Sequence, residues 1–288
     1  MTYLCGKVRS TLHMRQRAAT TYLLIILAAL SFRTCQAQKI EFKEIGRASV
    51  ERWLGEAPAK DAQRKEELWS YFEAAGCQAG LSEQPVKHQR LPNILCKLPG
   101  SSNSAVLVGA HFDHVGIGQG IADNWSGAVL LPLLYESLSN LPRKHTFVFV
   151  AFTAEEQGLI GSQYYAKQMS AEEVARTRAM VNLDTLGLSP TKVWVSRADK
   201  RLFELLIRVA ASRKLPLEGV NVEQVGSADS ESFARLKIPR IAIHSVTQET
   251  LPILHSSRDK LAALNLSDYY DTYRLVAAYL AYLDQVLE

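Results

Sequence analysis

Residues 109–127 read GAHFDHVGIGQGIADNWSG, and the rest of the chain is best interpreted outward from this stretch. The apolar residues 105–108 predict a strand that leads into it, and the two-residue period of a strand places His111 and Asp113 on the same side of its end. Asp123 precedes an apolar run at residues 128–134, where the N-terminus of a helix favours a carboxylate. The stretch therefore predicts an imidazole and two carboxylates close together, which suits a divalent metal.

Strands and helices alternate on both sides of this stretch. Apolar runs predict the strands, and apolar residues at helical spacing predict the helices. The expected strands are residues 86–90, 93–98, 105–108, 145–152, 180–184, 192–195 and 241–244, and the expected helices are residues 61–75, 123–139, 157–168, 202–213 and 266–287. Pro132 predicts a kink or a missing hydrogen bond in the helix at 123–139. The alternation indicates an α/β layer sandwich.

The size and charge of the chain limit its class. Its 288 residues are 47% hydrophobic and 22% charged, which is ordinary for a globular protein with one large core. The formal net charge is +4, but five basic residues and no acidic ones precede residue 38. Beyond them 28 basic residues face 29 acidic ones, so the charge balance gives no indication of nucleic-acid binding.

The first 37 residues have the order of a secretory signal. Arg15 and Arg17 precede the apolar run TYLLIILAALSF at residues 21–32, and CQA at residues 35–37 ends the segment in small residues. The run is short for a membrane span of about 20 residues. We expect a signal peptide at residues 1–37, a single domain at residues 38–288 and a secreted or periplasmic protein. The alternative is an uncleaved anchor, which would attach the protein to a membrane.

The expected export decides how the cysteines are interpreted. Cys5 and Cys35 lie in the predicted signal segment, which leaves Cys77 and Cys96 as an even pair in an exported chain. Such a pair predicts a disulfide, and two buried free thiols are the alternative.

Polar residues also follow three other apolar strands. Glu155 and Glu156 come directly after FVFVAFTA, Asp184 stands in VNLDTLG, and His255 stands in LPILHSSRD after the strand at 241–244. Ligands of open α/β sheets bind where the carboxyl ends of the strands meet, so these residues are candidates for chemistry. Taken singly, each has an ordinary interpretation as a helix-opening pair, a turn residue or a loop histidine.

Together these residues form a candidate site for two metal ions. The candidate ligands are two imidazoles and three carboxylates, namely His111, Asp123, Glu156, Asp184 and His255. The set suits two zinc ions if one carboxylate bridges them. Asp113 can accept a hydrogen bond from the far nitrogen of His111, and Glu155 can act as the general base of metal-assisted hydrolysis.

The chain resembles the co-catalytic zinc aminopeptidase family of bacterial leucyl-aminopeptidase type, which also contains glutaminyl cyclases. The resemblance covers about residues 86–285 and consists of motifs in the order HxD, ADNWSG, FTAEEQGLIGS, NLD and HSSRD. The resemblance implies a zinc-dependent exopeptidase fold, a three-layer α/β sandwich with a mixed, mostly parallel central sheet. It implies that His111 and Asp184 bind one zinc, that Glu156 and His255 bind the other, and that Asp123 bridges them. It also implies that Glu155 is the general base and that Asp113 supports His111.

The sequence departs from the family pattern at two places. Trp125 occupies a position that is usually small or acidic, where it either narrows the substrate mouth or packs at the start of the helix. Ser230 stands where the family often has histidine, and its neighbour Asp229 either receives a substrate amine or caps the next helix. His244 is expected to be a core residue, and His114 is expected to line the cleft.

We therefore expect a zinc-dependent aminopeptidase that removes N-terminal residues from peptides by means of a metal-activated water. Its substrates would be peptides with a free N-terminus. The alternatives are a glutaminyl cyclase with one zinc ion and a non-catalytic, peptidase-like ectodomain.

Overall fold

The computed structural model describes residues 40–222 and 226–288, and residues 40–288 form one compact unit. The predicted signal peptide or anchor lies outside the described residues. Among the helices that are described, none combines the length and the apolar character needed to cross a bilayer.

Within the described residues, eight strands form one sheet in the order β1-β2-β4-β3-β5-β8-β6-β7. The strands are β1 (Leu81–Gln84), β2 (Asn93–Leu98), β3 (Ala105–His111), β4 (Thr146–Phe152), β5 (Thr177–Leu183), β6 (Lys192–Val193), β7 (Glu218–Gly219) and β8 (Arg240–His244). The central strands β4, β3, β5 and β8 are parallel, whereas β1 with β2, β2 with β4, and β6 with β8 pair antiparallel. The predicted mixed, mostly parallel sheet is confirmed.

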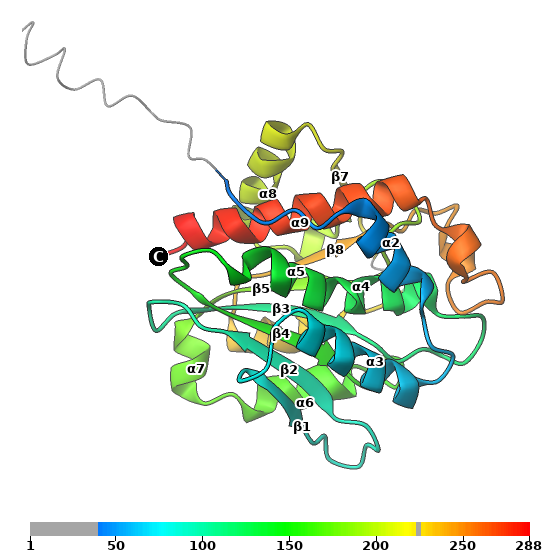
Figure 1. Ribbon diagram of the computed structural model, residues 1–288, viewed down its shortest axis with the longest axis horizontal. Helices are drawn as coiled ribbons and strands as arrows, with labels where there is room; N and C mark the ends of the chain where they lie inside the picture. Colours follow the sequence, from blue (N-terminus) through cyan, green and yellow to red (C-terminus); the bar gives the residue numbers. More distant parts are fainter. Residues whose placement is uncertain (1–39, 223–225) are drawn as a thin grey trace, which may run out of the picture. The chain divides into compact units, whose positions relative to one another are not determined.

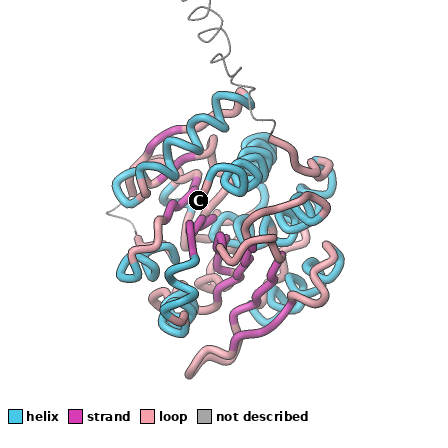
Figure 2. Tube along the Cα trace, turned by 90° about the vertical axis from the view of Figure 1, so that its left-hand side faces the viewer, coloured by secondary structure: helices cyan, strands magenta, loops and turns pink. Residues whose placement is uncertain are grey.

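Helices cover both faces of this sheet. The helices are α2 (Arg47–Gly55), α3 (Asp61–Ala74), α4 (Ser126–Ala128), α5 (Leu130–Ser139), α6 (Ile160–Gln168), α7 (Ala171–Arg176), α8 (Lys200–Arg213) and α9 (Leu266–Val286), with shorter turns η1 (Ile121–Trp125), η2 (Val195–Arg197), η3 (Asp229–Leu236), η4 (Leu251–Ile253) and η5 (Leu261–Ala263). Figure 1 shows α9 alongside α5 and α8, and these helices lie on one face with α2 and α3. Helices α6 and η3 pack on the other face, so the strands run between two helical layers (Figure 2).

Burial explains why the central strands have no polar alternation. Strands β3 and β4 are covered on both faces, so their sequences AVLVGAH and TFVFVAF are apolar almost throughout. Helix α5 is apolar for the same reason, since it lies between the sheet and α9. Pro132 has no N–H to donate to the carbonyl of Ala128, and helix α4 ends at Ala128.

Two local expectations are wrong. Residues 86–90 form a turn instead of a strand, because Pro85 and Pro92 flank them and His88 has a positive φ of 64°. On its other edge from β4, β2 pairs with β1, which lies closer to the N-terminus than residues 86–90. The long helix expected from Asp123 begins instead at Ser126, and Asp123 itself has an extended backbone with φ −117° and ψ 93°.

The predicted disulfide is confirmed. Cys77 follows α3, Cys96 lies in β2, and their sulfur atoms are bonded. Both residues are fully buried, so the bond fastens helix α3 to the sheet from within the core.

Candidate metal site

The site lies at one edge of the sheet because four neighbouring parallel strands end there. Strands β4, β3, β5 and β8 lie side by side, so their carboxyl ends share this edge. His111 is the last residue of β3, and Asp184 follows β5 directly. Glu155 and Glu156 come three and four residues after β4, and His255 lies in the loop that follows β8.

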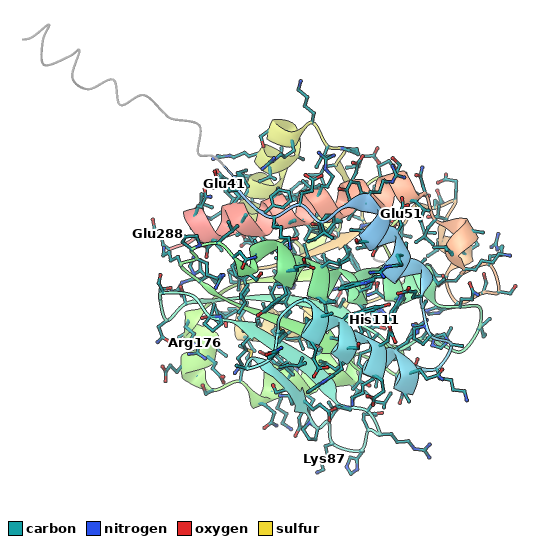
Figure 3. All side chains as sticks on the ribbon, viewed as in Figure 1. Glu41, Glu51, Lys87, His111, Arg176 and Glu288 are labelled. Atoms are coloured by element: carbon teal, nitrogen blue, oxygen red, sulfur yellow. A yellow bond between two sulfur atoms is a disulfide. The ribbon has the colours of Figure 1, made fainter. Side chains whose placement is uncertain are left out.

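His111 is at the centre of the site. Its side chain is 1% exposed. Figure 3 labels it near the middle of the view, whereas Lys87 and Arg176 lie at the margins. Its Nε2 lies 3.3 Å from Oδ1 of Asp123 and 3.8 Å from Oδ1 of Asp184. Oε2 of Glu155 is 4.0 Å away from the same nitrogen. One imidazole nitrogen therefore faces three carboxylates.

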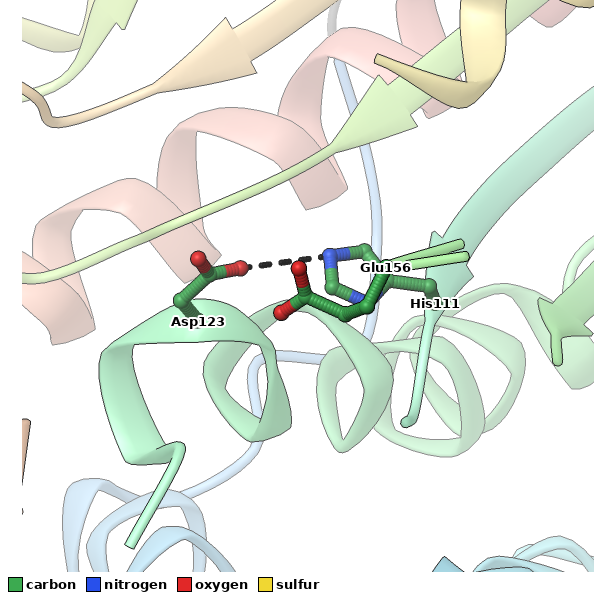
Figure 4. Close-up of side chains that lie close together, drawn as sticks. All are labelled: His111, Asp123 and Glu156. Atoms are coloured by element: carbon green, nitrogen blue, oxygen red, sulfur yellow. Dashed lines mark ion pairs between the residues drawn. The ribbon is translucent and has the colours of Figure 1, made fainter. Parts of the chain in front are cut away.

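His255 makes the matching contacts on the other side of Asp123. Its Nε2 lies 3.1 Å from Oδ2 of Asp123 and 3.1 Å from Oε2 of Glu156. The close-up in Figure 4 shows the carboxylate of Asp123 facing the ring of His111, with Glu156 beside them. Each oxygen of Asp123 thus faces a different histidine, which is the arrangement that a bridging carboxylate requires.

The donor set fits a pair of divalent cations. Two overlapping groups of possible ligand atoms, His111 with Asp123 and Glu156, and His111 with Glu155 and Asp184, each lie within 4.8 Å of one another. His111 can bind only one cation, so a second cation needs His255, whose Nε2 lies 3.1 Å from both Asp123 and Glu156. Oε1 of Glu156 is buried and has no hydrogen-bond partner among the described residues. A buried carboxylate without a donor needs a positive partner, and imidazole with carboxylate oxygen is a donor set typical of zinc.

The protonation behaviour of the cluster shows the same surplus of negative charge. Burial raises the pKa of Glu155 to about 9 and that of Glu156 to about 7, and neighbouring carboxylates add to both effects. Hydrogen bonding to Asp123 raises the pKa of His255 to about 9. Burial opposes ionisation of Asp123, but His111 and His255 together hold its pKa below the usual range. The cluster therefore favours bound protons or cations.

Asp113 lies at the site but makes different contacts from those expected. Its Oδ1 is 3.7 Å from Nδ1 of His111, which is too long for a hydrogen bond. The nitrogen lies instead 3.2 Å from the backbone oxygen of Asp113. The carboxylate accepts hydrogen bonds from the backbone N–H groups of Glu155 at 3.0 Å and Glu156 at 3.2 Å. Asp113 thus fixes the turn that carries both glutamates.

A cavity of about 370 Å³ opens beside the cluster. One wall consists of the polar residues described above. The other wall is mostly apolar and includes Trp194, Ala242, Val246, Leu251 and Leu254. His244 also lines it, but its Nδ1 accepts from the N–H of Val246 and its Nε2 donates to the oxygen of Val220. Burial lowers the pKa of His244 to about 4, so this wall carries no charge at neutral pH.

The positions that departed from the family pattern are now placed. Trp125 is fully buried, donates to the backbone oxygen of Trp53 and does not line the cavity, so it packs at the helix start. Asp229 is fully buried near Glu155, with neither oxygen hydrogen-bonded among the described residues, and burial raises its pKa to about 7. The expectation that His114 lines the cleft is wrong for this cavity, because its Nδ1 lies 2.8 Å from Oδ1 of Asp61 and the residue is not part of the cavity lining.

Sequence reasoning missed two buried charged residues behind the site. Asp259 accepts from the N–H groups of Ala122 and Asp123. Arg64, in α3, donates to the backbone oxygens of Phe112 and Gly120. The HSSRD motif could have indicated Asp259, because this carboxylate lies only four residues after the candidate ligand His255 and therefore close to the site. Arg64 lies in a helix with an ordinary amphipathic pattern, so the sequence offered no signal for it.

Fold and site together define a class of α/β protein whose parallel strands end in an imidazole and carboxylate site suited to two cations. A family model makes this specific: residues 93–280 match Peptidase family M28, and the chain belongs to that family. It is 35% identical over 151 residues to leupeptin-inactivating enzyme 1 of Streptomyces exfoliatus, an alignment that covers 51% of this chain and 34% of that protein. The chain thus spans about a third of the length of this relative.

Solved structures share the fold. The zinc aminopeptidase BSAP from Bacillus subtilis superposes with a TM-score of 0.61 and 25% identity, covering 69% of this chain and 50% of that one. A glutaminyl cyclase from an Acidobacteriales bacterium superposes with a TM-score of 0.69 and 15% identity, covering 87% of this chain and 98% of that one. At 15% identity the second likeness shows the fold alone.

Proposed function

We propose that the protein is a zinc-dependent exopeptidase, and specifically an aminopeptidase. The observation that carries this proposal is the position of Asp123, whose two oxygens lie 3.3 Å and 3.1 Å from the Nε2 atoms of two different histidines. His111 and Asp184 would hold one zinc ion, Glu156 and His255 would hold the other, and Asp123 would bridge them. Bound there, the metal pair would polarise a carbonyl group and lower the pKa of water.

Glu155 is the proposed general base. Its side chain is 11% exposed and its Oε2 lies 4.0 Å from Nε2 of His111, so it reaches the cluster without being needed as a ligand. Its carboxylate would take a proton from the attacking water and return it to the leaving amine. Asp113 would keep Glu155 in place through the backbone hydrogen bond at 3.0 Å.

The cavity supports a substrate with a free amino group and an uncharged side chain. Asp184 lines the polar side of the cavity, and its carboxylate suits a protonated N-terminus. The wall that contains Trp194, Leu251 and Leu254 suits an apolar side chain, because it offers no charged group to pair with. We therefore propose that peptides with an apolar N-terminal residue are preferred.

A panel of aminoacyl fluorogenic substrates, assayed with and without a chelator and alongside a metal count, tests the proposal. We expect two zinc ions per chain, hydrolysis of leucyl over lysyl and glutamyl substrates, and loss of activity with the chelator. Glu155→Ala should retain both metals and lose about 10²–10⁴-fold in kcat. Near-native turnover by this variant would rule out Glu155 as the base.

A glutaminyl cyclase is the second candidate, because a protein of that function shares this fold. The two functions differ in their products and in their metal content. One zinc ion per chain, together with cyclisation of N-terminal glutamine, would support the cyclase.

We also propose that the protein is exported. The disulfide between Cys77 and Cys96 supports this proposal, because such bonds persist in oxidising compartments. N-terminal sequencing of the mature protein would locate the cleavage site, and an intact N-terminus recovered with membranes would favour the anchor instead.

A further inference from the structure

A buried arginine holds the loop that joins two of the candidate ligands. Residues 112–120 connect His111 to the turn that carries Asp123. Arg64 is 0% exposed, and its guanidinium donates to the backbone oxygens of Phe112, at the start of this loop, and of Gln119 and Gly120, at its end. The two ends of the loop are therefore tied to one rigid, planar group.

The loop is shaped around this guanidinium. Gly120 has a φ of +54°, and a Cβ at this position would lie 2.6 Å from Cβ of His114 and 3.0 Å from Nη2 of Arg64. A larger residue would therefore push the loop away from the arginine. The guanidinium also lies over the ring of Trp125, with Cζ 5.7 Å from the ring centroid.

The same helix makes a second contact with the loop. Asp61, in the first turn of α3, lies 2.8 Å from Nδ1 of His114. Asp259 holds the following turn from the opposite side, through the N–H groups of Ala122 at 2.7 Å and Asp123 at 3.1 Å. The segment between the two ligands is thus held by two buried charged side chains, Arg64 and Asp259, and by the partly exposed Asp61.

We propose that Arg64 is a positioning residue that sets the affinity of the site for its metal ions. By fixing both ends of residues 112–120, it fixes the placement of Asp123 relative to His111. Arg64 lies outside residues 93–280, so this function belongs to the segment that precedes the region matched to the family. The inference depends on the metal site proposed above.

The alternative is that Arg64 stabilises the fold without affecting the site. Zinc affinity separates the two, measured by competition with a chromophoric chelator, together with thermal unfolding of the metal-free protein. The variants are Arg64→Lys, which keeps the charge but loses the fork of donors, and Arg64→Met, which removes both. Arg213→Lys is the matched control, because Arg213 also donates to a backbone oxygen, that of Ile40, and lies over an aromatic ring, that of Phe42.

We expect both Arg64 variants to bind zinc about 10–100-fold more weakly, as is typical when a group that orients ligands is removed. The affinity of Arg213→Lys should stay within about twofold of that of the wild-type protein. If Arg64→Met fails to fold, Arg64→Lys and Asp61→Asn decide the matter, since Asp61 is partly exposed and its loss leaves no cavity. For Asp61→Asn we expect a smaller loss of affinity.

Lowered unfolding temperature with unchanged zinc affinity in Arg64→Lys would overturn the inference and leave Arg64 a purely structural residue. A wild-type protein that binds no zinc would instead overturn the proposed function. The two failures are therefore distinguishable in one set of titrations.

Discussion

The two histidines of the site differ sharply in how they are held. His111 ends β3, a central strand of the sheet, and its side chain is 1% exposed. His255 lies in a loop with a φ of +53°, and its side chain is 55% exposed. Both nonetheless bring Nε2 to within 3.3 Å of the same carboxylate, that of Asp123.

This difference divides the site into a strand half and a loop half. The strand half, His111 and Asp184, follows two adjacent strands, so the sheet fixes its geometry. The loop half, Glu156 and His255, depends on turns held by individual hydrogen bonds. A preorganised set of ligands loses less conformational entropy on binding, so we expect the strand half to bind its metal more tightly.

The largest effect should come from the residue that the two halves share. Asp123→Ala should remove both metals, because neither half keeps its full set of ligands. We expect kcat/KM to fall about 10³-fold, which corresponds to a loss of about 4 kcal/mol in transition-state stabilisation. Metal analysis and a kinetic assay measure this effect. Asp271→Ala, which removes a surface carboxylate of α9, is the control and should retain both metals. Two metals in Asp123→Ala would show that the halves are independent.

Replacing one histidine at a time should separate the halves. His255→Ala should lose the weaker metal and destabilise the metal-free protein by less than about 1 kcal/mol, because the side chain of His255 is 55% exposed even though it contacts Asp123 and Glu156. His111→Ala should lose the tighter metal and also destabilise the metal-free fold by about 1–3 kcal/mol, because it leaves buried carboxylates unpaired. The measurements are zinc titration and denaturant unfolding with chelator. Equal effects from both variants would contradict the division.

The same division explains what the sequence could predict. His111 and Asp184 could be predicted from the sequence because each comes at the end of an apolar strand, and parallel strands bring their carboxyl ends together. Glu156 and His255 were candidates for the same reason, but the assignment of each ligand to one of two metals came only from the motif resemblance. The path of a loop depends on contacts distant in sequence, so its contacts could not be derived from the strands. The contacts of Asp113 were incorrectly predicted for this reason: its partners Glu155 and Glu156 are set by the turn after β4.

Errors in the fold have a similar origin. Residues 86–90 have the composition of a strand, but the prolines on either side prevent it, and antiparallel pairing with β2 is made by residues 81–84. The sequence could not decide whether Trp125 is buried, because the side chains that pack on it come from α2 and α3, over 50 residues earlier. Its indole N–H bonds to the backbone oxygen of Trp53.

A third change should affect neither half. Cys77→Ala combined with Cys96→Ala removes a disulfide that closes a loop with a sequence separation of 19 residues, which is worth about 3 kcal/mol in the chain-entropy account. We expect a lower unfolding midpoint, with zinc content and turnover unchanged at 25 °C. Reduced metal content in this variant would show that the strand half depends on the packing of α3 as well as on the sheet.

The smallest effect concerns His244, the last residue of β8, from which the chain continues toward His255. Its folded-state pKa of about 4 lies below the ordinary value of 6.5, because burial disfavours the charged ring and Nδ1 accepts from the N–H of Val246. The unfolded chain therefore binds the proton first, and stability falls as the pH falls below about 6.5. From pH 7.5 to pH 5 the contribution of His244 to stability should fall by about 2 kcal/mol, while the raised pKa values of Glu155 and Glu156 act in the opposite direction.

Denaturant unfolding at both pH values, with chelator present, measures this slope. The amide of His244→Gln does not titrate, so the difference in slope between this variant and the wild-type protein gives the contribution of His244. His88→Gln, at an exposed position, should have the slope of the wild-type protein. An unchanged slope in His244→Gln would mean that the ring is already protonated or solvated in the folded protein. The uncharged apolar wall beside the loop half would then be wrong, and charged N-terminal side chains would have to be reconsidered as substrates.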